Sequence, residues 1–294
     1  MQANILTEIF LPLGLGIIML GMGLSLSLTD FKRLIDFPRA TFIGLIAQLV
    51  LLPLIAFGLL HFFDLPPELA AGVMLIAFCP GGPTSNLLSN MARADLALSI
   101  TLTALSSMIT VFTIPILMNL AMEYFMGEGR YVQLPVVKTM LQILVITIIP
   151  VSIGMAVRKR FSSLASRMEN PFKIASAIFM VIIIAGVFYN ERDNIADFFA
   201  QVGTITLMLN IIILAIAYGV AKVSRLSHPQ SATISIESGI QNGTLAIAIA
   251  SGSMLLNNPQ MAIAPAIYSL IMFFTGFVVV YIYSRRFMFD QEFV

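Results

Sequence analysis

The sequence has little of the material from which most enzyme and metal sites are built. Its 294 residues include a single cysteine, Cys79, and two histidines, His61 and His228. One cysteine excludes a disulfide framework and a multi-cysteine metal site, and Cys79 is expected to be apolar filler. Both histidines stand at the ends of apolar segments, so histidine-based chemistry inside those segments lacks residues to perform it. The sequence therefore does not predict an enzyme.

Charge is also scarce. Charged residues make up 11% of the chain and hydrophobic residues 59%, with a formal net charge of +1. This composition excludes a soluble globular domain and predicts an all-α polytopic membrane protein that lies in a lipid bilayer. A net charge this small gives no reason to expect a nucleic-acid partner.

Nine apolar stretches are each long enough to cross a bilayer as a helix, and the connections between them are too short to hold a soluble domain. Connections carry turn signals such as Asp64-Leu65-Pro66-Pro67, Glu169-Asn170-Pro171 and Asn257-Asn258-Pro259. The N-terminus lacks a basic segment and a small-residue cleavage site, so the first stretch is expected to be retained. The predicted spans are 9–29, 39–63, 70–90, 95–122, 135–158, 172–190, 200–224, 230–252 and 260–286.

Lysine and arginine gather in alternate connections, as is typical of cytoplasmic loops. All but three of the 16 lysine and arginine residues lie on that side, the exceptions being Arg130, Lys138 and Arg192. This bias predicts insertion in a cell (inner) membrane with the N-terminus outside and the C-terminus in the cytoplasm. Every acidic residue except Glu237 lies between the stretches or at their ends.

Glu237 is the one acid predicted to lie within the membrane, in the run Ile236-Glu237-Ser238-Gly239-Ile240-Gln241-Asn242-Gly243-Thr244. A charge at the bilayer centre costs at least about 2.5 to 3.5 kcal/mol, so such a carboxylate needs a partner. No lysine, arginine or histidine lies in the interior of an apolar stretch, which makes a bound cation the expected partner. The two glycines weaken the helix and would free main-chain carbonyls to help hold that cation. The alternative is a protonated Glu237 that fills a packed helix interface.

A second broken segment is predicted at Cys79-Pro80-Gly81-Gly82-Pro83-Thr84-Ser85-Asn86, halfway along the third span. Two prolines and two glycines do not fit a continuous helix, because proline removes a main-chain donor and clashes one turn back. The half-helix that starts near Thr84 or Ser85 would present free N–H groups to an anionic ligand at mid-membrane. The alternative is a simple proline kink.

The two broken segments also indicate an internal repeat. Aligning Ser85 and Asn86 with Gln241 and Asn242 brings the first four spans roughly onto the last four. Spans paired in this way enter the membrane from opposite sides, which predicts an inverted repeat with one broken helix in each half.

Further polar residues are expected near the two breaks. Ser99 and Thr103 lie four residues apart, hence on one helix face, and Gln48 sits in the middle of the second span. A lone hydroxyl in such a helix usually bonds its own i−4 carbonyl. Two of them beside Ser85, Asn86 and Glu237 favour a site of neutral oxygens and one carboxylate for a hard cation such as sodium.

Both polar runs resemble the two signatures of the bile acid:sodium symporter family, Cys79-Pro80-Gly81-Gly82 through Ser85-Asn86 and Glu237 through Asn242. The similarity covers essentially the whole chain. It implies two discontinuous helices that cross within a core domain, a smaller panel domain beside it, and two sodium ions as coupling ions behind the crossing. Carried over by position, it implies a first sodium site (Na1) of Ser85, Asn86, Ser99, Thr103 and Glu237, and a second (Na2) of Gln48, Glu237, Gln241 and the main-chain carbonyls of Ser238 and Ile240.

The same resemblance implies a division into domains. The panel domain would comprise 9–29, 135–158 and 172–190, and the core domain 39–122 and 200–286. Bacterial members commonly have ten spans, whereas nine are predicted here, and the first panel helix has no counterpart. The cavity between the domains would receive the substrate, with Asn242 and the main chain near Pro83 and Thr84 facing it.

These observations predict a secondary transporter that uses a sodium gradient to import an organic anion, a bile-acid-like steroid or a small carboxylate, by alternating access. A proton-coupled transporter or exchanger is the first alternative, because Glu237 could carry a proton. An intramembrane hydrolase with Ser85 as nucleophile is a remote alternative, since no His, Lys or Asp is expected at that depth in the membrane to act as its base.

Overall fold

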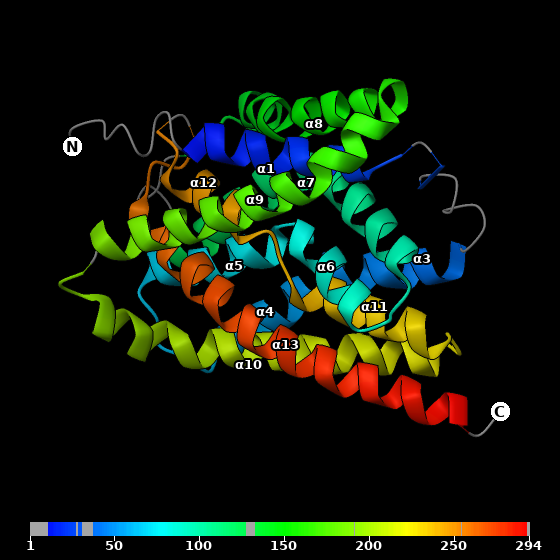
Figure 1. Cartoon of the computed structure of the whole chain (residues 1–294). Coiled ribbons are helices and arrows are strands. Elements are labelled where there is room, and N and C mark those ends of the chain that lie inside the picture. Colours follow the sequence, from blue (N-terminus) through cyan, green and yellow to red (C-terminus); the bar gives the residue numbers. More distant parts are fainter. Residues whose placement is uncertain are drawn as a thin grey trace.

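The computed structural model describes residues 11–27, 29–30, 38–127, 133–190, 192–253 and 255–292, and every regular element within them is a helix. The all-helical prediction is therefore confirmed for this part of the chain (Figure 1). Arg130, used above for orientation, lies outside it. The helices are α1 (Leu11–Ser25), α3 (Pro38–Ile46), η2 (Ala47–Leu51), α4 (Leu52–Leu60), α5 (Pro67–Phe78), α6 (Pro83–Met91), α7 (Leu96–Met126), α8 (Val136–Arg160), α9 (Ser162–Asn190), α10 (Ile195–Val223), α11 (His228–Gly239), α12 (Gly243–Ser251), η3 (Pro259–Ala262) and α13 (Ile263–Glu292).

Six helices in the described residues are long and apolar enough to cross a membrane. Two shorter apolar helices, α1 and α5, accompany them. Large apolar side chains stand exposed along α8 and α9, for example Val145, Ile149, Ile178 and Val181, which suits contact with lipid rather than water. The chain is therefore a multi-pass membrane protein. The six helices are Pro38–Leu60, Leu96–Met126, Val136–Arg160, Ser162–Tyr189, Ile195–Val223 and Pro259–Arg285.

The predicted turn at Glu169-Asn170-Pro171 is wrong. These residues lie inside α9, which begins at Ser162 directly after α8 ends at Arg160. Proline inside a membrane helix is tolerated where neighbouring groups satisfy the freed carbonyl, so Pro171 does not end the helix here. The turns predicted near Pro66 and Asn258 are present, because α5 and η3 begin directly after them.

The predicted stretch 70–90 is divided in the structure. Helix α5 ends at Phe78, Cys79 is extended, and α6 begins at Pro83. Proline suits the first position of a helix, because its fixed φ matches the helix and its missing N–H would have no partner there. The composition of this segment alone accounts for the break.

The stretch 230–252 is also divided, without any proline at the break. Helix α11 starts with a capping box, in which Ser227 and Gln230 satisfy each other's main-chain N–H groups, and it ends at Gly239. Helix α12 restarts after Asn242, whose side-chain oxygen accepts from the N–H of Leu245 at 3.0 Å. An asparagine in this capping position stabilises a helix start by about 1 kcal/mol.

Helix α1 packs mainly against α8 and α9, while α10 packs against α11 and α13, and α5 against α7. In Figure 1, α1 and α8 lie along one edge of the molecule and α10 along the opposite edge. Gly23 and Gly154 let α1 and α8 touch, since a Cβ on either would collide with the other helix's main chain. Small residues of this kind allow close approach between membrane helices.

Candidate ion and substrate site

The two helix breaks lie against each other and pair through their main chains. Gly81 and Gln241 form an antiparallel bridge. The N–H of Gly82 donates to the carbonyl of Ile240 at 3.1 Å, and the N–H of Asn242 donates to the carbonyl of Pro80 at 2.8 Å. Both segments are buried, so these hydrogen bonds supply partners that non-helical backbone needs inside a membrane protein. The pairing places the ends of four half-helices at one point.

Glu237 lies at this point and is almost fully buried. Its Oε1 atom accepts hydrogen bonds from Ser85 (2.6 Å), Ser99 (2.6 Å) and Thr103 (2.9 Å). The amide oxygen of Asn86 joins the group, at 2.9 Å from the hydroxyl of Ser99. Three of the residues named for the first sodium site thus contact one oxygen of Glu237, and the fifth, Asn86, contacts two of their hydroxyls. We call this the hydroxyl side of Glu237.

The hydroxyl side holds more acceptor oxygens than hydrogens. Each hydroxyl has one hydrogen to donate. Yet Ser85 lies within hydrogen-bond distance of Glu237 Oε1 and of the carbonyl of Gly82 (2.7 Å), and Ser99 is within reach of Glu237 Oε1 and Asn86 Oδ1. Thr103 is also within 3.0 Å of the carbonyl of Ser99. A bound cation would relieve such a surplus of acceptors.

The second carboxylate oxygen has different surroundings. Oε2 of Glu237, Oε1 of Gln48 and Oε1 of Gln241 are buried and accept no hydrogen bond. The amide nitrogens of the two glutamines donate to main-chain carbonyls. Gln48 donates to the carbonyl of Glu237 at 3.1 Å, and Gln241 donates to the carbonyl of Ser238 at 2.8 Å. An unsatisfied buried acceptor costs about 1 to 3 kcal/mol, so three together are costly without a cation. We call this the amide side of Glu237.

Local structure positions the residues of the amide side. Gln48 lies in η2, a π-helical turn within the otherwise continuous helix of α3 and α4, and such turns often occur at functional sites. A Cβ on Gly81 would collide with Glu237 Oε2 and lie 2.9 Å from the Gln48 amide nitrogen, so Gly81 leaves this space open. The carbonyls of Ser238 and Ile240 accept from Gln241 and Gly82, which leaves each of them one lone pair.

The type of oxygen indicates the type of ion. Across the described residues, no three His, Cys, Asp or Glu side chains gather closely enough to hold a metal ion. The site offers hydroxyl, amide, main-chain and single-carboxylate oxygens, which suit a hard cation of low charge rather than a transition metal.

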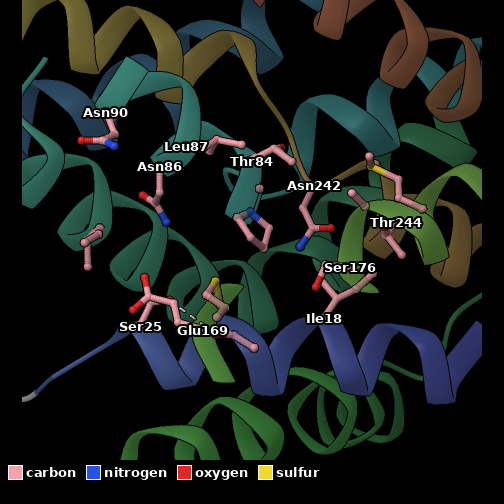
Figure 2. A pocket seen from close by; sticks show the side chains of 18 of the residues that line it. Ile18, Ser25, Thr84, Asn86, Leu87, Asn90, Glu169, Ser176, Asn242 and Thr244 are labelled. Carbon is pink, nitrogen blue, oxygen red and sulfur yellow. Dashed lines mark hydrogen bonds between the residues drawn. The ribbon is translucent and has the colours of Figure 1, made fainter. Parts of the chain in front are cut away.

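A cavity of about 290 Å³ adjoins the break on the side of α1 and α9. The residues predicted to face the substrate, Asn242, Thr84 and Pro83, all line it, and Figure 2 shows the Thr84 and Asn242 side chains at its wall. Asn86 and Gln241 line it too, so this cavity shares residues with both sides of Glu237.

Two residues of the site were missed by the sequence reasoning. The amide of Asn210 on α10 donates to the carbonyl of Gly239 at 2.7 Å, and the hydroxyl of Tyr268 on α13 donates to the same carbonyl at 3.0 Å. They hold the end of α11 at the break. Asn210 carried a usable signal, because it is a polar residue in the middle of an apolar stretch, as Gln48 is. Tyr268 carried none.

A bundle of apolar helices with two paired breaks around a buried carboxylate is typical of secondary transporters, in which broken helices form the ion and substrate sites. Comparison with known proteins agrees. The profile of the Sodium Bile acid symporter family matches residues 12–198, and the chain belongs to this family.

Three relatives illustrate the range of the similarity. The uncharacterized sodium-dependent transporter YocS of Bacillus subtilis is 31% identical over 89% of this chain and 78% of its own length. The probable chloroplastic sodium/metabolite cotransporter BASS1 of Arabidopsis thaliana is 30% identical over 96% of this chain and 68% of its own length. The human ileal sodium/bile acid cotransporter is 28% identical over 95% of this chain and 82% of its own length.

Membership places the chain among sodium-dependent transporters rather than enzymes. The hydrolase alternative is therefore dropped, although the Glu237 carboxylate lies beside Ser85. That carboxylate oxygen is shared by three hydroxyls, so it does not single out Ser85 as a nucleophile.

Proposed function

We propose that the chain is a sodium-coupled symporter that imports an organic anion by alternating access. The observation that carries this proposal is the surplus of acceptor oxygens on both sides of Glu237. A carboxylate with no basic side chain among its hydrogen-bond partners needs a cation inside a membrane protein. An ion-free site would carry an uncompensated buried charge, which opposes movement of the empty transporter.

Two sodium ions are proposed, one on each side of the carboxylate. On the hydroxyl side, Na1 would take Ser85, Asn86, Ser99, Thr103 and Glu237, which are already linked by hydrogen bonds through their hydroxyl groups. On the amide side, Na2 would take the oxygens that lack donors and the remaining lone pairs of two main-chain carbonyls. Its ligands would be Gln48, Glu237, Gln241, Ser238 and Ile240.

The anion is proposed to bind in the cavity at the break, against Asn242 and the main chain of Pro83 and Thr84. The first turns of α6 and α12 start there, and helix N-termini favour negative charge. Asn86 and Gln241 touch both the cavity and an ion site. Shared residues of this kind give a physical route by which sodium raises the affinity for the anion.

The movement is proposed to occur between a panel of α1, α8 and α9 and a core of the remaining described helices. Support comes from packing, since α1 lies mainly against α8 and α9, and the cavity lies where α1 and α9 face α6 and α12. The nine-span count, the inverted repeat, the inner membrane and an outside N-terminus belong to the same proposal. The divided stretches 70–90 and 230–252 support the repeat.

A proton-coupled transporter remains the alternative to be tested. A proton needs only one or two oxygens, whereas the hydroxyls of Ser85, Ser99 and Thr103 all donate to this carboxylate. The amides of Gln48 and Gln241 contact main-chain carbonyls of the same helix end. The number of oxygens favours sodium.

The first experiment is a thermal-shift screen of organic anions with sodium chloride or choline chloride. A ligand that binds the folded protein raises its stability by RT ln(1 + [L]/Kd), and a coupled substrate should do so more strongly with sodium present. The best anion is then used for initial uptake into proteoliposomes against external sodium, with a protonophore control. Uptake that ignores sodium and follows a pH gradient would support the proton-coupled alternative instead.

A variant separates the substrate from the ions. Asn242→Ala should weaken binding of the anion at least about fivefold while sodium binding without anion changes less. Because Asn242 also caps α12, Asn242→Ser is the matched control that keeps the cap and removes the amide. Equal loss of anion and sodium binding in both variants would move Asn242 into the ion sites.

A further inference from the structure

Two exposed arginines near the junction of α8 and α9 serve neither the proposed ion sites nor the cavity. Arg160 ends α8, and Arg167 lies in the second turn of α9. Residues 159–168 contain Lys159 as a third basic residue and no acid. Within the described part of the chain, neither arginine forms an ion pair. This positive charge therefore has no counterpart among the described residues.

Arg158, two residues before Arg160, has the opposite orientation. It lines the cavity together with Glu169, and its Nη1 atom donates to the carbonyl of Leu24 at 2.7 Å. Two residues correspond to about 200° of rotation around a helix, so Arg160 projects from the other side of α8, away from the cavity. That side is the surface that α8 turns toward lipid.

Each exposed arginine continues a stripe of apolar side chains. On α8, Ile149 and Ile153 are exposed, and Arg160 follows them at intervals of 11 and 7 residues. Both intervals return to the same face of a helix with 3.6 residues per turn. Helix α9 repeats the arrangement in the opposite order, with an arginine first and two exposed isoleucines after it at the same intervals. The residues of the α9 stripe are Arg167, Ile174 and Ile178.

The length of α9 places Arg167 at the depth of the lipid headgroups. A helix of 29 residues is about 43 Å long, whereas the hydrocarbon core of a bilayer is about 30 Å thick. The excess falls at the start of α9, because residues 162–170 include three serines, Arg167, Glu169 and Asn170. Lipid tails that cover Ile174 and Ile178 thus bring their headgroup to Arg167.

We infer that Arg160 and Arg167 bind the phosphate of an anionic phospholipid, whose tails lie along the exposed stripes of α8 and α9. The two helices pack against each other and are joined by Phe161 alone (Figure 1). Arg167 stands only about 8 Å further along α9 than its first residue, so two long arginine side chains can reach one phosphate. The planar fork of a guanidinium matches phosphate oxygens better than a lysine ammonium does.

The local charge favours an anionic lipid over a zwitterionic one. Residues 159–168 carry three positive charges and no negative charge, and basic residues near a membrane surface attract anionic lipids. The ammonium group of a zwitterionic headgroup would meet the same positive charge. Phe161 is exposed, its ring centre lies 5.8 Å from the Arg160 guanidinium, and an aromatic ring suits the headgroup region.

The other end of α9 provides a matched contrast. There the Arg192 guanidinium lies 5.2 Å from the ring centre of Tyr189. However, Asp193 Oδ1 is 3.9 Å from Arg192 Nε, and Asp197 occupies the first turn of α10. An arginine beside an aromatic ring is thus present at both ends, but at this end acids offset its charge. Arg192 is therefore the control for the site at Arg160 and Arg167.

The test is thermal unfolding of the purified full chain in detergent micelles with added dioleoylphosphatidylglycerol or dioleoylphosphatidylcholine, which share their tails and differ in headgroup charge. Every sample contains choline chloride at constant ionic strength, without sodium or an organic anion, so the result is independent of the proposed function. A lipid that binds the folded protein raises its stability by RT ln(1 + [L]/Kd), which yields its affinity. The wild type should bind phosphatidylglycerol about 25-fold more tightly than phosphatidylcholine, from about fivefold for each arginine.

Variants identify the residues responsible. Arg160→Gln and Arg167→Gln should each lower the affinity for phosphatidylglycerol about fivefold, and together about 25-fold, with little change for phosphatidylcholine. Arg192→Gln should change neither affinity. Replacing Arg160 and Arg167 by lysine keeps the charge but removes the forks, so the affinity should still fall at least about threefold. Because both arginines are exposed, each variant should unfold at the wild-type temperature when no lipid is added.

Several outcomes would overturn the inference. A wild type with equal affinity for the two lipids has no anionic site, and unchanged affinity in the double glutamine variant would place the lipid elsewhere. An Arg192→Gln protein that loses as much affinity as Arg160→Gln, or a double lysine variant that loses none, would show that diffuse charge attracts the lipid. Soluble glycerol 3-phosphate that stabilises the wild type as much as phosphatidylglycerol would make this a site for a free phosphate.

Discussion

The two oxygens of one carboxylate have contrasting neighbours. Oε1 of Glu237 accepts from three hydroxyls, whereas Oε2 accepts no hydrogen bond, and the side-chain oxygens of Gln48 and Gln241 also lack donors. Hydroxyls can rotate their hydrogens toward the carboxylate when no ion is present, but an amide oxygen has no hydrogen to offer. In this structure the hydroxyl side is compensated in part by these three hydrogen bonds, whereas no donor reaches Oε2, because the amide nitrogens of Gln48 and Gln241 donate to main-chain carbonyls.

This difference assigns unequal roles to the two proposed sodium sites. An ion held by Glu237 Oε2 and by the side-chain oxygens of Gln48 and Gln241, as proposed, would replace no hydrogen bond and would relieve three unsatisfied acceptors. An ion on the hydroxyl side must first turn three donors away from Oε1. We therefore expect the amide side to bind sodium more tightly, with the predictions below testing that order.

Glu237→Gln removes the charge common to both sides and should have the largest effect. Sodium affinity should fall by more than about a hundredfold, since even a residue outside the ligand shell typically costs 10 to 100-fold. The sodium-free protein should be no less stable than the wild type, because an uncompensated buried charge is gone. Equilibrium binding of radioactive sodium and thermal unfolding with and without sodium measure the two effects. Wild-type sodium affinity in this variant would remove Glu237 from both sites.

Gly81→Ala should close the amide side alone. Its new Cβ would overlap Glu237 Oε2 and crowd the Gln48 amide. Overpacking of this kind costs about 1 to 3 kcal/mol, and where that cost falls on the ion-bound state it lowers sodium affinity at least about fivefold. Gly82→Ala is the matched control, because its Cβ would have 3.1 Å to the carbonyl of Gln241 and 3.3 Å to Thr84. Sodium titrations of both variants by thermal shift make the comparison. Equal losses of sodium affinity in the two variants would mean that the substitutions disturb the helix break as a whole and not the amide side.

Removing ligands from one side at a time should separate the two ions. Gln241→Ala should lower sodium affinity more than Ser99→Ala or Thr103→Ala does. Each should reduce the Hill coefficient for sodium from about two toward about one, because a site is lost while its partner remains. Sodium-dependent uptake in proteoliposomes gives both quantities. Larger losses for the hydroxyl variants would reverse the order of the two sides.

The two helix breaks show why part of this site could be predicted from sequence. The α5–α6 break follows from Pro80, Gly81, Gly82 and Pro83 themselves, because proline and glycine act on their own backbone. The α11–α12 break has only glycines, and it is held by groups far away in sequence. Asn210 and Tyr268 each lie 29 residues from Gly239, and no local pattern predicts that contact.

The proposed ion ligands divide in the same way. Glu237, Ser99 and Thr103 followed from the cost of burying polar groups in a membrane, whereas the contact of Gln48 with the far side of Glu237 followed only from the family resemblance. Arg158 was missed because charge at a helix end has an ordinary explanation in topology. The turn at Glu169 was wrong, so the sequence placed that acid in a loop rather than on the cavity wall.

Tyr268→Phe should have the smallest effect, because it changes the support of the site and not a proposed ligand. The carbonyl of Gly239 keeps its bond from Asn210, and one Asn210 N–H loses the Tyr268 hydroxyl as acceptor. Stability should fall by about 1 kcal/mol, as for one buried hydrogen bond, with sodium affinity changed less than about threefold. Tyr281→Phe, an exposed tyrosine on the same helix, should change neither. Thermal unfolding and sodium titration measure both, and a loss of sodium affinity as large as that of Gln241→Ala would make the Gly239 carbonyl part of the amide side itself.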